Sequence, residues 1–188
     1  VFFFPSIVSG LLLGYIWGYI LSPMKTGALN SLLGLFGAGP IGFTATEWGA
    51  KISIILVAVW TSTGWYATIY LAYLQAIPNE YYEAAAIDGA SRWQQFTKIT
   101  FPLLAPGLTV NTLLLLTNGL KVYDLPYALT KGGPGYSNYT VTQVIIQRGL
   151  SEKQYGASTA LATIFIIIVA LIAGIQYMAM SKREADVS

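Results

Sequence analysis

The chain has 188 residues, a formal net charge of +2, 55% hydrophobic residues and only 10% charged residues. Soluble domains carry roughly 25% charged residues, so this chain holds more apolar surface than one core can bury, and its expected solvent is the lipid bilayer. The small net charge gives no support for a nucleic-acid partner. Cysteine and histidine are absent, which excludes disulfides, thiolate or imidazole metal ligands, and Ser–His or Cys–His nucleophiles.

Four apolar segments are long enough to cross a membrane, since a spanning helix needs about 20 mostly apolar residues. Each is taken from a run without charged residues, and together they predict helices over about 1–22, 52–75, 101–121 and 157–180. We therefore expect an all-α membrane protein, a polytopic helical bundle in which residues 1–188 form part of a single transmembrane domain.

The first apolar segment carries small residues at a strict spacing of four. These residues are Ser6, Gly10, Gly14, Gly18 and Ser22. Such a stripe favours close packing of another helix, and a direct role in transport is the alternative. The segment has no basic n-region and no small-residue cleavage site, so we do not interpret it as a signal peptide. Because a helix is expected from the first residue, we expect the chain to be a piece of a longer protein.

A fifth run without charge, 26–46, is rich in glycine and contains Pro40. These residues would break a lipid-facing helix and expose its backbone, so we predict a loop with a short helix around 28–36.

Polar side chains inside the predicted spanning helices admit two interpretations. Asn111 and Asn118 are seven residues apart and lie on about one face of their helix. Amides in such positions either bond to a neighbouring helix or line a watery path. Our candidates for a solute path are Thr61, Ser62, Trp65, Asn118 and Gly119.

The segment between the third and fourth predicted helices, 121–153, contains a turn at 131–135, whose sequence is Lys-Gly-Gly-Pro-Gly. Apolar residues at 141, 144, 145 and 150 then predict an amphipathic segment along the membrane surface.

The polar segment 76–100 separates two long apolar runs and predicts a helix, a glycine turn and a second helix. Pro78 with Glu80 and Glu83 is typical of a helix start, and Gly89 of a helix end. Ser91 and Gln94 predict a capping box at the start of the second helix. By itself, this pattern is also compatible with a solvated hairpin that only joins two spanning helices.

The same segment contains a motif with specific spacing. Its residues are Glu83-Ala84-Ala85, Asp88-Gly89-Ala90, Ile99 and Pro102-Leu103-Leu104. This string resembles the EAA loop of binding-protein-dependent ABC importer permeases, in their carbohydrate branch of the maltose and glycerol-3-phosphate type. Phe101 stands where that family usually has leucine. The string 129–135, Leu-Thr-Lys-Gly-Gly-Pro-Gly, resembles an outer-loop signature of the same branch.

The resemblance implies a fold of the type I ABC importer permease kind, with six core helices of which this chain would hold the last four. It implies a multi-pass protein of the bacterial cytoplasmic (inner) membrane, with segment 76–100 as a cytoplasmic coupling loop. The count of lysine and arginine in the loops, taken alone, points weakly to the opposite orientation.

The resemblance also implies partners: two ABC ATPase subunits, a second permease subunit, and an extracytoplasmic solute-binding protein that delivers a sugar or small polyol. The residues implied in ATPase coupling are Glu83, Ala84, Ala85, Asp88 and Gly89. ATP hydrolysis would belong to the partner, because this sequence has no phosphate-binding string of the G-x-x-x-x-G-K-[ST] type. We expect no enzymatic activity, cofactor or metal in this chain.

Two other classes of function are weaker alternatives. A motor-independent secondary transporter or channel for a small polar solute calls for ionisable residues inside the membrane to couple ions, and the predicted spans offer amides and hydroxyls instead. A membrane enzyme would have to use the acids Asp88, Asp124 or Glu83, which have no histidine or obvious carboxylate partner nearby.

Overall fold

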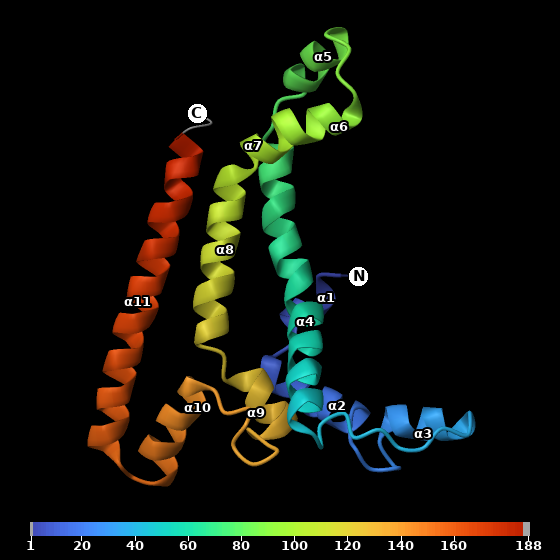
Figure 1. The fold of residues 1–188 in the computed structure, drawn as a ribbon, viewed down its shortest axis with the longest axis vertical. Helices are drawn as coiled ribbons and strands as arrows, with labels where there is room; N and C mark the ends of the chain where they lie inside the picture. The colour runs from blue at the N-terminus through green and yellow to red at the C-terminus, as the bar shows by residue number, and fades with distance from the viewer. Residues whose placement is uncertain (1, 186–188) are drawn as a thin grey trace. The chain divides into compact units, whose positions relative to one another are not determined.

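The computed structural model describes the backbone of residues 2–185 and the side chains of residues 2–181, and within that part of the chain every regular element is a helix (Figure 1). The chain divides into two units. The first unit joins Val1–Gly64 to Leu120–Ile166, and the second joins Trp65–Gly119 to Ile167–Ser188. Each unit is described below by itself.

The first predicted spanning helix is broken in the structure. In place of one helix over 1–22 there are α1 (Phe4–Ile7) and α2 (Gly10–Ile20), with Val8 and Ser9 both extended between them. Valine, serine and glycine are weak helix formers in succession, and serine favours caps, which accounts for the break at this point. The 11 residues of α2 are too few to cross a bilayer.

Helix α2 packs closely on α9 (Asp124–Thr130), as Figure 1 shows. A Cβ atom placed on Gly14 would lie 2.5 Å from the Cβ of Ala128 and 3.1 Å from the carbonyl oxygen of Leu125. Only a residue without a side chain fits there, so the predicted role of the small-residue stripe in helix packing is confirmed at Gly14.

The small core of the first unit lies beside this contact. Leu21, Val57 and Leu125 are buried together, and Trp17 meets Trp60 edge to face with ring centroids 5.4 Å apart. Apolar contacts of this kind join α2 and α9 to the first part of α4 (Glu47–Gln75).

The glycine-rich run contains α3 (Ala28–Leu35), which confirms the predicted short helix. Asn30 is buried and holds the surrounding loops in place. Its Nδ2 donates to the carbonyl oxygens of Ser22 and Ile41, both at 3.0 Å, and its Oδ1 accepts from the backbone nitrogen of Ile41 at 2.9 Å.

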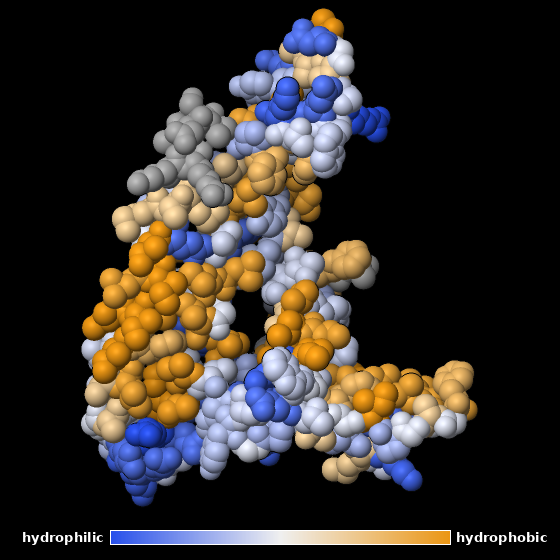
Figure 2. Space-filling model, viewed as in Figure 1, coloured by the Kyte–Doolittle hydropathy of each residue, from blue (hydrophilic) through white to orange (hydrophobic). Residues whose placement is uncertain are grey.

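Within the described residues, two helices are long and apolar enough to cross a membrane: α4 and α11 (Tyr155–Ala185). Helix α4 begins five residues before the predicted start, because Glu47 and Lys51 add a first turn with an ion pair at i, i+4. Hydrophobic side chains predominate on the visible surface of the middle of α11 (Figure 2), as expected of a helix in contact with lipid.

The third predicted span is bent. Residues Arg92–Leu103 and Ala105–Leu120 form a helix pair with an angle of 61° between them, and they count as a third span only if taken together. Four predicted spans are thus two unbroken helices, one bent pair and one broken segment. Proline explains the bend. Pro102 and Pro106 have no backbone N–H group, so neither can donate the helical hydrogen bond to the carbonyl oxygen four residues earlier. Before Pro102 the chain widens into the π-helical turn Phe96–Thr100.

In the second unit, α8 (Ala105–Leu120) packs on the latter part of α4. Asn111 is fully buried, and its Nδ2 donates to the carbonyl oxygen of Tyr66 at 3.1 Å. A Cβ atom on Gly107 would lie 2.8 Å from the ring of Tyr73. For Asn111, the structure therefore selects the interhelical hydrogen bond over a lining role.

After α9, the first unit continues with α10 (Val141–Ile146) and the π-helical turn Gln147–Ser151. The predicted turn at 131–135 is present, with positive φ at Lys131, Gly132 and Gly135. Ser158 fastens the start of α11 to this region, since its Oγ donates to the carbonyl oxygen of Ile145 at 2.7 Å.

Candidate functional site

The polar segment 76–100 forms a hairpin of α5 (Glu80–Ile87) and α6 (Arg92–Gln95), followed by the π-helical turn. At the C-terminus of α5, Gly89 has φ +75°. The backbone nitrogen of Ala90 donates to the carbonyl oxygen of Ala85 at 2.9 Å, and that of Gly89 to the carbonyl oxygen of Ala86 at 3.1 Å. This pair of bonds is a Schellman motif, which uses glycine to satisfy the last carbonyl groups of a helix and to reverse the chain.

The second helix starts with the predicted capping box. The Oγ of Ser91 accepts from the backbone nitrogen of Gln94 at 3.3 Å, and the Oε1 of Gln94 accepts from the backbone nitrogen of Ser91 at 2.8 Å. Trp93 and Phe96 stack on one face with ring centroids 5.8 Å apart. Both ends of the turn are therefore fixed by local bonds.

One longer-range bond ties the two arms of the hairpin together. The hydroxyl groups of Tyr82 in α5 and Thr100 at the end of the π-helical turn lie 2.9 Å apart. Sequence reasoning did not find this contact, because no local pattern links two hydroxyl groups that are 18 residues apart.

The hairpin presents its motif to the surroundings. Glu83, Ala84, Asp88 and Gly89 are exposed, and Ala85 is half-buried. Ile87 has 87% of its surface exposed and Trp93 72%, on a segment where hydrophilic and hydrophobic residues are mixed at the surface (Figure 2). Large exposed apolar side chains beside small ones and a free carboxylate are typical of a protein-binding surface.

The residues predicted for a solute path fall into both units. Thr61 and Ser62 belong to the first unit, and their hydroxyl groups donate within α4, at 2.9 Å to Val57 and at 2.6 Å to Ala58. Their oxygen atoms retain lone pairs that can accept a bond from a solute.

The remaining path candidates belong to the second unit. Half of the surface of Trp65 is exposed, and Asn118 and Gly119 near the end of α8 are exposed. The Asn118 side chain is thus accessible, whereas Asn111, on about the same face of the helix, is enclosed between α8 and α4.

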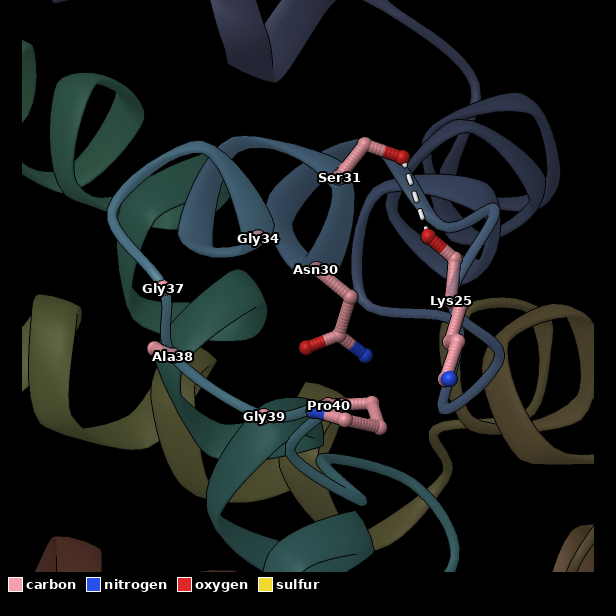
Figure 3. Close-up of a pocket in the computed structure, with 8 residues that line it drawn as sticks. All are labelled: Lys25, Asn30, Ser31, Gly34, Gly37, Ala38, Gly39 and Pro40. Atoms are coloured by element: carbon pink, nitrogen blue, oxygen red, sulfur yellow. Dashed lines mark hydrogen bonds between the residues drawn. The ribbon is translucent and has the colours of Figure 1, made fainter.

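A hollow of about 340 Å³ lies between α3 and the loop that follows it (Figure 3). The side chain of Asn30 points into it toward Pro40, and the Oγ of Ser31 donates to the carbonyl oxygen of Lys25 at 3.1 Å. Because the amide of Asn30 is already engaged by backbone groups, this hollow organises the loop, and Lys25 is its one charged lining residue.

The described residues offer no set of catalytic groups. They contain no cluster of three acidic, histidine or cysteine side chains that would hold a metal ion. The pKa of Tyr123 is raised, first by burial and then by its neighbours Tyr127 and Asp124, so this tyrosine stays neutral at physiological pH.

Comparison with known proteins agrees with this arrangement. The family described as "binding-protein-dependent transport system inner membrane component" matches residues 1–185. A probable starch degradation products transport system permease protein from Thermoanaerobacterium thermosulfurigenes is 36% identical over 187 residues, which are 98% of this chain and 62% of that protein. A trehalose/maltose transport system permease protein from Thermococcus litoralis is 33% identical over 88% of this chain and 54% of that protein.

A solved structure has the same fold. It is a bacterial ABC transporter involved in the import of the acidic polysaccharide alginate, with a TM-score of 0.86 at 24% identity, over 97% of this chain and 64% of that chain. The present chain spans about three fifths of the length of these relatives and has the fold of a type I ABC importer permease. It belongs to the family of binding-protein-dependent transport system inner membrane components.

Proposed function

We propose that this chain is the membrane-spanning permease subunit of an ATP-driven ABC importer, which translocates a sugar or small polyol delivered by an extracytoplasmic solute-binding protein. The observation that carries the proposal is the exposed hairpin α5–α6 with its Glu-Ala-Ala-x-x-x-Gly string. Within a chain of this apolar composition, such a hairpin is suited to a protein partner in water rather than to lipid.

The names of the relatives support the proposed class of solute. Their names refer to starch degradation products, trehalose or maltose, and multiple sugars. A saccharide needs hydrogen-bonding groups and aromatic faces along its path, and Thr61, Ser62, Trp65, Asn118 and Gly119 are proposed to supply them.

In the proposed mechanism, the hairpin sits in a cleft of an ATPase subunit. The carboxylate of Glu83 contacts a basic group there, Ala84 and Ala85 allow close approach, and Asp88 and Gly89 form the turn. Closure of the ATPase pair moves the hairpin, and the bond between Tyr82 and Thr100 passes this motion to the base of α8. The permease then alternates between two states, with a second permease subunit as its counterpart.

The alternative of a motor-independent transporter or channel has less support. Coupling to an ion gradient normally uses an acid or base inside the membrane, and the runs 52–79 and 99–120 contain neither.

The proposal is tested by reversing the charge of Glu83. In the full-length protein expressed with its ATPase, we expect Glu83→Lys to insert normally but to lose ATPase co-purification and transport, because a cation replaces the acid at the docking surface. Glu80→Lys is the matched control, since Glu80 lies in the same exposed helix outside the motif. ATPase association that is equal in Glu83→Lys and wild type would refute the proposed coupling site.

A further inference from the structure

A second hollow, of about 450 Å³, lies in the first unit, beside α10 and the π-helical turn that follows it. It is lined by Tyr136, Tyr139, Val144, Gln147, Arg148 and Glu152. Small-molecule sites are typically about 300–1,000 Å³ in volume, so the hollow has the size for one small ligand. It plays no part in the coupling described above.

Two tyrosine rings form one wall of this hollow. They meet at 64° with centroids 5.2 Å apart. Tyr139 is half-buried, and its ring fills the space that a side chain on Gly132 would need, so it is held in position. Tyr136 has 79% of its surface exposed. One ring is therefore fixed against the loop, and the other is presented to whatever enters the hollow.

Three planar polar side chains also line the hollow. The Nε2 of Gln147 lies 3.5 Å from the Oε1 of Glu152, which is a long hydrogen bond, and Arg148 is exposed. Among the residues whose side chains are described, the single salt bridge joins Lys51 and Glu47, so the guanidinium group of Arg148 and the carboxylate of Glu152 are not paired with each other. Both retain hydrogen-bonding capacity for a ligand.

The chemistry of the lining selects the class of ligand. The opposite charges of Arg148 and Glu152 leave the lining with no net charge, which disfavours a simple anion or cation as the ligand. Val144 is the one aliphatic lining residue, which disfavours a purely apolar ligand. Aromatic faces next to planar donors and acceptors match a molecule with an apolar C–H face and a rim of hydroxyl groups.

We propose that this hollow is a saccharide-binding site, in which the tyrosine rings stack on a sugar ring while Gln147, Arg148 and Glu152 bond to its hydroxyl groups. The inference rests on the proposed function: with the hairpin docked to an ATPase in the cytoplasm, segment 121–153 at the other end of the helix 105–120 lies on the extracytoplasmic side. There the site would hold the solute at the surface, apart from the path candidates in the spanning helices.

The test uses the full-length permease, assembled with its partner subunits in nanodiscs without the solute-binding protein. Saturation-transfer NMR is recorded with three probes: maltotriose, trehalose and diacetylchitobiose. We expect at least one probe to bind to the wild type, and its apparent affinity to fall about tenfold or more in Tyr136→Ala and in Arg148→Ala. Leu150→Ala is the control, because Leu150 is 74% exposed in the same turn but does not line the hollow.

The outcomes separate this inference from the proposed function. No saccharide signal from the wild type, or an unchanged signal in both variants, overturns the inference. Variants that weaken docking of the sugar-free solute-binding protein while the saccharide signal is unchanged also overturn it, since the hollow is then a protein contact. Transport and ATPase association by the wild type test the proposed function independently, so either proposal can fail without the other.

Discussion

Gly89 is the residue on which the direction of the hairpin α5–α6 depends. It has φ +75°, and a Cβ atom added there would meet no atom within 4 Å. Any cost of a side chain at this position is therefore conformational and not steric. For a residue with a Cβ atom, the left-handed region costs about 1–2 kcal/mol.

We expect Gly89→Ala to weaken ATPase association about 5–30-fold, because that cost falls on the conformation of the hairpin that the partner binds. The measurement is the dissociation constant between the full permease and its ATPase. Gly174→Ala is the control, since Gly174 also has open space around it but lies in α11 with an ordinary helical backbone. Equal affinity of Gly89→Ala and wild type would show that the turn is not part of the docking geometry.

The hydrogen bond between the hydroxyl groups of Tyr82 and Thr100 links the two arms of the hairpin. Removing one hydroxyl group from a part-buried pair is expected to lower stability by about 0.5–1.5 kcal/mol. In Tyr82→Phe we expect transport to fall while ATPase association persists, because docking is intact and the link to α8 is lost. Thr100→Val should have the same effect, and the double variant should add little to either.

Tyr81→Phe serves as control for this cycle, because Tyr81 is 53% exposed in the same helix. Additive losses of transport in the double variant would mean that the two hydroxyl groups act separately.

At the scale of the helices, the contact between α2 and α9 leaves little room for a side chain at Gly14. We expect Gly14→Val to lower the stability of the first unit by about 1–3 kcal/mol, since the new side chain would overlap Ala128. Thermal unfolding of the detergent-solubilised protein measures the effect. Gly34→Val is the matched control, because Gly34 lies in α3 with no atom within 4 Å of an added Cβ. A similar shift in both variants would indicate that helix propensity, and not packing, is responsible.

Local chemistry made some elements predictable. The capping box at Ser91, the glycine turn at Gly89 and the short helix at 28–36 all depend on residues within a few positions of one another. The length of an uncharged run does not reveal an interruption inside it, so the break at Val8–Ser9 and the bend before Ala105 were missed. Pro102 and Pro106 were visible in the sequence, but how far they bend a helix depends on its surroundings.

Contacts between distant segments were not predictable at all. The rings of Tyr136 and Tyr139 line one hollow together with side chains of the π-helical turn at Gln147–Ser151, and nothing in the local sequence indicates this. The same holds for the choice between the two interpretations of Asn111, which was decided by the carbonyl group of Tyr66 on another helix.

At the scale of the whole molecule, most apolar surface is left uncovered by the chain itself. Aliphatic side chains along α11, from Ile164 to Ile175, are largely exposed, and the buried core of the first unit is small. Lipid and neighbouring transmembrane helices are the expected cover, in agreement with a family of inner membrane components.

Movement of the solute through the membrane involves the whole molecule, and Asn118→Leu tests whether Asn118 contacts the solute. Losing one hydrogen bond to a solute costs about 0.5–1.5 kcal/mol, so we expect the KM for transport to rise about 2–12-fold while protein stability is unchanged. Asn111→Leu should do the reverse, since it removes the bond to Tyr66: less folded protein, with an unaltered KM. An unaltered KM in Asn118→Leu would remove this residue from the path.

The hydroxyl pair that joins Tyr82 to Thr100 has a consequence for evolution and for engineering. It closes segment 82–100 into one structural unit, and the hydrogen bonds of the turn and of the helix cap are made within that segment. Such a segment can be exchanged between homologues as one piece. On the proposed function, a chimera joined at these two positions should bind the ATPase of the donor protein and keep the solute specificity of the recipient. Specificity for the ATPase and specificity for the solute can then diverge separately.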